Sequence, residues 1–159
     1  MRFAYSTINW GATCDLDAAL ADIRASGWGA VELFGHTLDW LGTPKTLTKK
    51  LGGLQPATLF SGIEIPVNDV QRTTQFNRID FAAEIGASEY GLVGGSRLRW
   101  RPPTEDEYIE LANFCEELAV YGKSRGVTVS YHPHVACTIE TSDEIDRLIA
   151  NSAELKLCL

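Results

Sequence analysis

The feature that most constrains the fold is a repeated alternation of short apolar segments with longer amphipathic ones. The apolar segments are rich in β-branched and aromatic residues and lack the polar–apolar alternation of a half-exposed strand. The amphipathic segments carry apolar residues at helical spacing. This order predicts an α/β chain with a parallel sheet covered by helices. The predicted strands are 2–9, 30–34, 56–65, 89–93, 127–131 and 155–159.

Start signals mark most of the helices. Asp15 is placed as the N-cap of the first helix, and Thr43 followed by Pro44 opens a later one. The segment through His36 and Trp40 is expected to be a loop. Two capping boxes begin the last two helices, and they pair Thr104 with Glu107 and Thr141 with Glu144.

Length and composition indicate one globular domain over residues 1–159 that acts on a small molecule. The formal charge of −7 and the pI near 4.9 argue against binding to nucleic acid or anionic lipid. The sequence shows no signal peptide and no apolar run of about 18 residues, so no membrane segment is expected. The four cysteines form no CxxC pair, which predicts reduced thiols and a cytoplasmic location.

Two architectures fit the alternation: an open doubly wound sheet and part of an eightfold barrel. Length favours the open sheet, since a complete barrel takes about 250 residues. The polar residues favour the barrel, because a barrel draws its site from many strand ends and an open sheet from one switch point. We predict a partial TIM-barrel type, with about five βα units and a sixth strand. The polar residues at the predicted strand ends are Asn9, Trp10, Glu32, His36, Glu64, Gly94, Gly95, Arg97, His132, His134 and Glu140.

The most informative stretch is Val127–Thr141, where His132 and His134 flank Pro133 at the end of an apolar strand. A spacing of two on an extended segment sends both imidazoles to the same side. With Glu140 close behind, this pattern favours a site over a loop cap made of histidines. Glu140 alone fits a solvated residue before the capping box as well as it fits a metal ligand.

Other strand-end residues carry weaker signals. Glu32 lies inside an apolar strand, where a carboxylate needs a partner, so a structural ion pair and a catalytic or substrate contact stay open. Glu64 and His36 fit loop-end polar groups better than functional ones. Asn9 and Trp10 fit packing at the barrel mouth or contacts to a polyol.

A glycine pair and an arginine follow the fourth predicted strand. Gly94 and Gly95 match no nucleotide-binding motif, so a plain turn and a close backbone approach to substrate both remain open. Arg97 fits a solvated basic loop or a phosphate contact.

Four stretches resemble the xylose-isomerase-like TIM barrels of sugar phosphate isomerases and epimerases, within them the inosose dehydratase branch. They are INWG at 8–11, GAVELFG at 29–35, SGIEIP at 61–66 and, most distinctive, YHPHVACTIETSDEIDRL at 131–148. The resemblance extends over essentially the whole chain.

The resemblance implies a divalent metal, namely Mn, Co, Mg or Zn, which assists proton abstraction next to a carbonyl of a keto sugar or cyclitol. It makes Glu140 the expected metal ligand, with His132, His134 and Glu32 as catalytic or orienting groups. Asn9, Trp10, Glu64, Gly94 and Arg97 are the expected substrate contacts.

Two departures qualify what the resemblance implies. Many relatives carry a metal-binding glutamate where this chain has His132, and the family continues past the sixth strand into a DTGH-like segment where this sequence ends at Leu159. We therefore expect a domain truncated at its C-terminus, in which the metal is not necessarily retained. The expected function is that of an isomerase, epimerase or dehydratase of carbohydrate metabolism. The alternatives are an inactive fragment, a sugar-binding module, and a homodimer that completes a barrel between two chains.

Overall fold

The computed structural model describes residues 3–95 and 101–159, and in this part of the chain the strands form one parallel sheet. The sheet has the order β1-β2-β3-β4-β5-β6, so each strand pairs with its neighbours in sequence. A doubly wound sheet would reverse direction at a switch point, and this one does not. The strands are β1 Tyr5–Ser6, β2 Ala30–Phe34, β3 Gln55–Ile63, β4 Glu89–Gly94, β5 Thr128–Tyr131 and β6 Lys156–Leu157.

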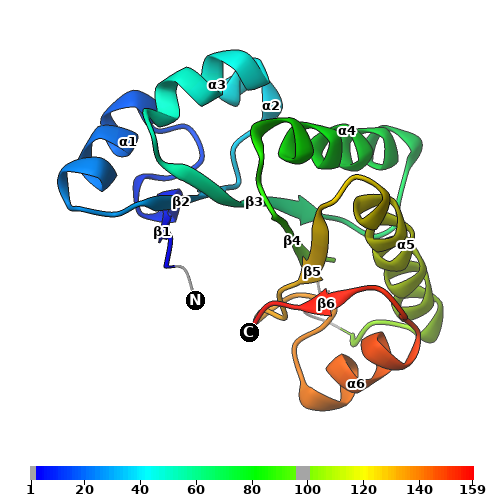
Figure 1. Ribbon diagram of the computed structural model, residues 1–159. Helices are drawn as coiled ribbons and strands as arrows, with labels where there is room; N and C mark the ends of the chain where they lie inside the picture. The colour runs from blue at the N-terminus through cyan, green and yellow to red at the C-terminus, as the bar shows by residue number, and fades with distance from the viewer. Residues whose placement is uncertain (1–2, 96–100) are drawn as a thin grey trace.

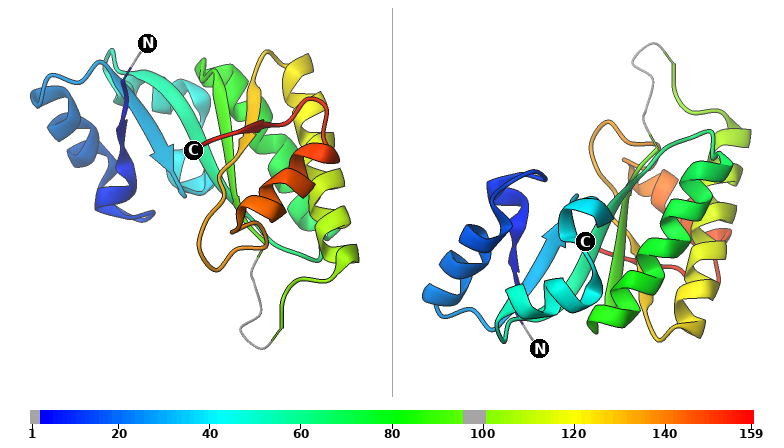
Figure 2. Two further views of the ribbon diagram at one scale, coloured as in Figure 1. Left: turned by 90° about the horizontal axis from the view of Figure 1, so that it is seen from below. Right: turned by 90° about the horizontal axis from the view of Figure 1, so that it is seen from above.

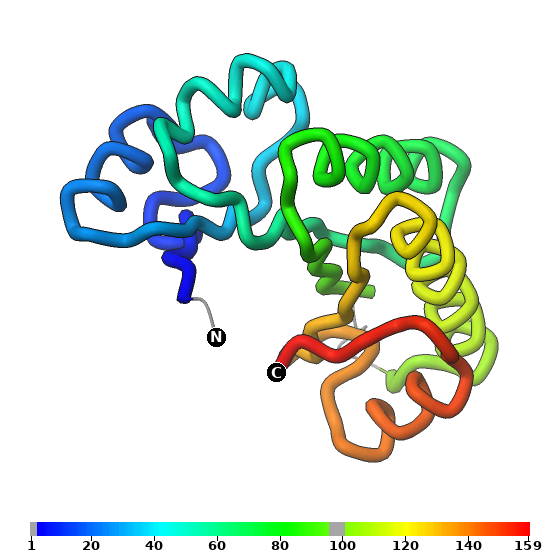
Figure 3. Tube along the Cα trace, in the orientation of Figure 1, coloured from blue at the N-terminus to red at the C-terminus, as the bar shows by residue number. Residues whose placement is uncertain are grey.

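The helices connect successive strands and lie on the outer side of the curved sheet, as Figures 1 and 2 show. The Cα trace in Figure 3 follows the same arc from the N-terminal to the C-terminal unit. This arrangement is that of an open, partial TIM barrel, as predicted. The helices are η1 Thr7–Trp10 (a 3-10 helix), α1 Leu16–Ala25, α2 Leu38–Leu41, α3 Pro44–Leu51, α4 Asp69–Ile85, α5 Glu105–Ser124 and α6 Ser142–Ala150.

The predicted helix starts are confirmed. Asp15 accepts a hydrogen bond from the Ala18 amide, and Thr43 accepts one from Thr46 ahead of α3. Both capping boxes form, with Thr104 and Thr141 as the N-caps of α5 and α6. Each cap satisfies an amide that has no partner inside the helix.

Two expectations about local structure are wrong. Of the strand expected over 2–9, the described residues from 3 onward form a strand at Tyr5–Ser6 only. The Ser6 side chain accepts a hydrogen bond from the Ile8 amide and starts the η1 turn. The loop expected through His36 and Trp40 contains the short helix α2, capped by Thr37. In both places a local side-chain cap decides the backbone conformation.

The core lies between the sheet and its helices, and the alternation along each strand divides side chains between two faces. Residues that face the helices are buried, among them Val31, Leu33, Leu59, Tyr90, Leu92, Val129 and Tyr131. The residues between them point the other way, into the concavity of the sheet. We call this second surface the inner face; it consists of Glu32, Phe34, Thr58, Phe60, Glu89, Gly91, Thr128, Ser130 and His132.

Candidate functional site

The two histidines after β5 lie side by side at its carboxyl end. The ring centroids of His132 and His134 are 5.7 Å apart, so the spacing of two does bring both imidazoles together. The His132 amide donates to the Leu92 carbonyl at 2.7 Å, which fixes this residue as an extension of β5. His132 is half-buried and His134 is exposed.

Backbone carbonyls hold each imidazole in one tautomer. The Nδ1 atom of His132 lies 3.0 Å from the Cys158 carbonyl oxygen, and that of His134 lies 2.9 Å from the Val135 carbonyl oxygen. A carbonyl only accepts, so Nδ1 carries the proton in both rings. In this tautomer of the neutral ring the lone pair is on Nε2, which can accept a proton or bind a metal.

A row of aromatic rings crosses the inner face and ends at His132. Phe34 and Phe60 have centroids 5.2 Å apart, and Phe60 meets His132 edge-to-face at 5.9 Å. Phe60 reaches His132 across Gly91 of the intervening strand, because a Cβ at that glycine would stand 2.4 Å from the Phe60 ring. This row was not predicted from the sequence, in which the glycine inside the fourth strand was its only signal, as a position of close approach.

Below the rings the inner face is polar. Register places Glu32 opposite Thr58, and Thr58 opposite Glu89. A cavity of about 360 Å³ opens on this face, and its lining includes Thr58, Glu89, Thr128, Ser130, Lys156 and Cys158. Burial raises the pKa of the Cys158 thiol, and the carboxylates of Glu32 and Glu89 raise it further. Glu32 thus lies close to the residue whose carbonyl orients His132.

A second group of predicted residues gathers around Cys137. Burial raises the pKa of its thiol, and the charges of Glu64 and Glu140 add to the rise, so both carboxylates lie near the sulfur. Glu64 follows β3, whereas Glu140 lies in the connection before α6. Glu140 also accepts a hydrogen bond from the Ala136 amide at 3.2 Å, which closes the turn after His134.

The glycine pair at the end of β4 packs against the protein itself. A Cβ on Gly94 would lie 2.2 Å from the Ile63 carbonyl oxygen. The Gly95 amide donates to that oxygen, and the Thr138 hydroxyl donates to the Gly95 carbonyl at 2.6 Å. Internal crowding is a sufficient reason for glycine at these positions. A substrate contact by Gly94 stays a prediction.

The remaining predicted contacts lie elsewhere. Asn9 is exposed on η1 and donates to the Tyr5 hydroxyl at 3.2 Å, while Trp10 packs edge-to-face on the Tyr5 ring. Both belong to the unit of β1, at the opposite end of the sheet order from β5. Arg97 lies outside the described residues.

His36 is a structural residue. Its side chain is fully buried, its Nδ1 donates to the Ala12 carbonyl at 2.8 Å, and its Nε2 accepts from the Thr7 hydroxyl at 2.8 Å. Burial lowers its pKa and the nearby Arg78 lowers it further, so the ring stays neutral. It ties η1 to the end of β2.

The described residues do not by themselves form a metal site. Over 3–95 and 101–159, no group of three or more His, Cys, Asp and Glu side chains is placed to hold an ion. Structural and catalytic zinc sites use at least three protein ligands, so the residues seen here do not fit a resident divalent metal alone. The role of Glu140 as a metal ligand stays a prediction.

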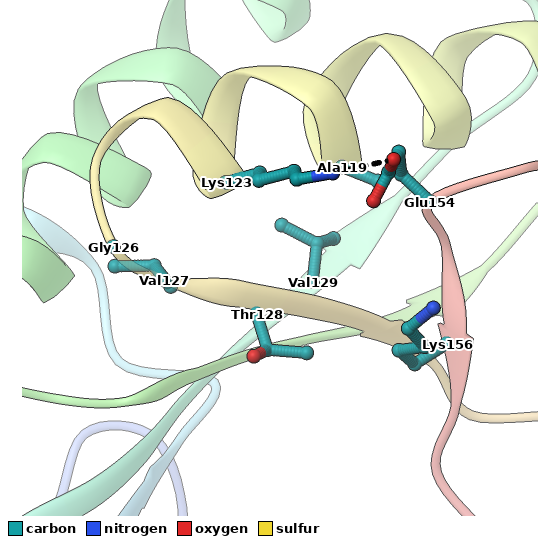
Figure 4. Close-up of a pocket in the computed structure, with 8 residues that line it drawn as sticks. All are labelled: Ala119, Lys123, Gly126, Val127, Thr128, Val129, Glu154 and Lys156. Atoms are coloured by element: carbon teal, nitrogen blue, oxygen red, sulfur yellow. Dashed lines mark hydrogen bonds and ion pairs between the residues drawn. The ribbon is translucent and has the colours of Figure 1, made fainter.

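Another cavity, of about 280 Å³, lies at the opposite end of β5 (Figure 4). It is lined by Gly126, Val127 and Thr128, where the strand begins, and by Lys123, which pairs with Glu154 at 2.6 Å. It lies at the amino end of β5, remote from the carboxyl ends of the strands, so it is not the candidate site.

Within the part of the chain that the structure describes, no helix combines the length and apolar character needed to cross a membrane.

Known proteins resemble this chain in sequence over half its length and in fold over nearly all of it. No family model matches the sequence. An inosose dehydratase from Lacticaseibacillus casei is 32% identical over 83 residues, which are 52% of this chain and 28% of that enzyme. The chain therefore aligns with less than a third of that relative.

Solved structures share the fold at low sequence identity. An L-ribulose 3-epimerase matches with a TM-score of 0.79 and 19% identity. The match covers 98% of this chain and 59% of the epimerase chain. A xylose isomerase-like TIM barrel protein from Mycobacterium smegmatis in complex with magnesium matches with a TM-score of 0.78 and 11% identity. The match covers 98% of this chain and 63% of that protein. An IOLI protein with a bound zinc atom matches with a TM-score of 0.72 and 15% identity. The match covers 99% of this chain and 62% of that protein. The resemblance to xylose-isomerase-like barrels is confirmed, and the chain spans about 60% of these neighbours.

Proposed function

We propose that the inner face binds a small polyol, a keto sugar or cyclitol, and that His132 and His134 move a proton next to its carbonyl. The observation that carries the proposal is the pair of adjacent imidazoles, each with Nδ1 within hydrogen-bond distance of a backbone carbonyl oxygen. General bases of this kind accelerate proton transfer by about 10² to 10⁴. The structural neighbours, which include an epimerase, support this class of reaction.

The lining of the inner face suits a polyol. Thr58, Thr128 and Ser130 offer hydroxyls, while Glu89 and Lys156 add an acceptor and a donor. The Phe60 ring and His132 provide an apolar surface above them, on which the carbon side of a sugar can pack. Glu32 is proposed as a further acid or base on this face.

A divalent metal would supply charge stabilisation next to the carbonyl. In this chain Glu140, His132 and His134 are the residues proposed to contact it, but over 3–95 and 101–159 no group of three such side chains is placed closely enough to hold an ion. Weak metal binding is therefore expected. Dialysis of the protein against EDTA followed by titration with Mn²⁺ measures it, with Glu140→Gln as the variant that should lower the affinity.

Proton exchange in D₂O tests the chemistry without knowledge of the product. The protein is incubated with an inosose or a ketose, and NMR follows loss of the α-proton signal. His132→Gln and His134→Gln should slow the exchange by about a hundredfold or more, the usual contribution of a general base. Val135→Ala is the matched control, since this side chain is exposed in the same loop. Exchange that is equally fast in all variants contradicts the assignment.

The second candidate is a sugar-binding module without chemistry. It is favoured by the lack of three metal ligands in the described part of the chain. Polyol binding measured by calorimetry, together with no exchange in D₂O with or without Mn²⁺, would select it. The outer edges of β1 and β6 pair with no described strand, so a homodimer is a proposal that sedimentation can test.

A further inference from the structure

A cavity between α4 and the carboxyl ends of β2 and β3, outside the candidate site, is lined by an unusual share of the buried polar groups. Its volume is about 300 Å³, about ten times the volume of one liquid water. Half of the eight buried polar or charged residues in the described part of the chain line it. These four are His36, Ser61, Gln75 and Arg78.

Arg78 gives the cavity its charge. The side chain is 5% exposed, and its guanidinium donates to the carbonyls of His36 and Phe60 at 2.8 and 2.9 Å. Its buried Nε atom reaches no acceptor in the described structure, and no ion pair with a described carboxylate neutralises the charge. A guanidinium has five N–H groups, so the two carbonyl contacts and a contact with the Tyr90 hydroxyl still leave the Nε–H unused.

The rest of the lining carries no opposite charge. No Asp or Glu lines the cavity, although the whole chain has a formal charge of −7. Thr37 and Thr74 stand at its exposed side, and Gly35 and Gly62 leave room near the strand ends. A nearly buried cation without an ionised partner favours an anion in the adjoining space.

We propose that this cavity binds a small oxyanion, a phosphate or carboxylate group, with Arg78 as its cationic anchor. The site lies on the helix side of β2 and β3, whereas His132 lies on the inner face. It is therefore distinct from the polyol site of the proposed function. The bound anion offsets the charge of Arg78 and stabilises the junction of α4 with the ends of β2 and β3.

The three histidines of the chain separate the two sites in one experiment. His36 lines the anion cavity, while His132 and His134 lie side by side at the carboxyl end of β5. Inorganic phosphate and, separately, acetate are titrated at constant ionic strength into protein with ¹³C-labelled histidine. A saturable shift of the His36 signals, with the other two unmoved, supports the proposal. Shifts confined to His132 and His134, or none that saturate, overturn it.

Charge variants at the cavity mouth provide the second test. Arg78→Met removes the anchor but also two bonds that tie β2 to β3, so the fold can fail. Thr74→Glu instead adds a negative charge at an exposed lining position and leaves Arg78 in place. Phosphate affinity should fall roughly tenfold, the effect of a like charge a few ångströms away.

Thr73→Glu is the matched control, since Thr73 is exposed on the same helix and does not line the cavity. This variant should keep the wild-type affinity for phosphate. Equal phosphate-dependent rises in Tm for Thr73→Glu and Thr74→Glu would contradict the site. In that case Arg78 serves only to clamp the two strands.

Discussion

Gly91→Ala tests the close contact that carries Phe60 across β4 to His132. The added Cβ would stand 2.4 and 2.6 Å from two ring carbons of Phe60, where carbon atoms normally rest at about 3.5–4.0 Å. Phe60 is 4% exposed, so the ring has little room to move away. Overpacking of this kind costs about 1–3 kcal/mol, and we expect about 2 kcal/mol from urea denaturation followed by circular dichroism.

A double-mutant cycle shows whether the cost comes from this contact. Phe60→Leu removes the ring edge, so Gly91→Ala should cost less in that background, by at least about 1 kcal/mol. The His132 ring signals in NMR should move in Gly91→Ala as the Phe60 ring shifts. A single-mutant cost within about 0.5 kcal/mol, the usual range for harmless surface changes, with an additive cycle would refute the contact.

Three further results are expected. Burial lowers the pKa of His36 in the folded protein below 6.5, so the unfolded chain binds more protons near pH 6 and the free energy of unfolding should fall as the pH drops below 6.5. His36→Gln should flatten that pH dependence. An unchanged slope of the free energy of unfolding against pH would contradict this prediction. Hydrogen bonds from Arg101 hold the pKa of Glu107 at about 2, so the stability that this ion pair contributes is present above pH 4.5 and is lost towards pH 2. Arg101→Gln should raise the pKa of Glu107 in an NMR titration. No rise would contradict the ion pair. Thr141→Ala should cost about 1 kcal/mol through loss of the α6 cap, measured by thermal melts, and Ser142→Ala is the control that should not.

The sequence predicted the order of the elements because each helix start depends on a few adjacent residues. Thr104 and Thr141 cap α5 and α6 through side-chain bonds to amides three residues away. The same locality explains the errors: Ser6 and Thr37 also start turns, and their signals were outweighed by the apolar residues around them. The polar residues at the ends of nearly every predicted strand indicated a barrel and not a doubly wound sheet. This distribution reflects the pairing of each strand with its neighbours in sequence.

The candidate site was only partly predictable. The spacing of His132 and His134 fixed their common side, since it follows from strand geometry alone. The Phe34–Phe60–His132 row depends on the register of three different strands, which no local pattern reports. For His36 the sequence showed a polar strand end, but its burial is decided by Thr7 and Ala12, far away in the chain.

The central claim is that β5 delivers two imidazoles to the inner face, where a polyol binds. Titration of an inosose or ketose into protein with ¹³C-labelled histidine tests it most directly, since the chain has three histidines. The account predicts saturable shifts of the His132 and His134 signals while those of His36 stay in place. Unmoved His132 and His134 signals at saturating polyol, or shifts of His36 alone, would contradict it.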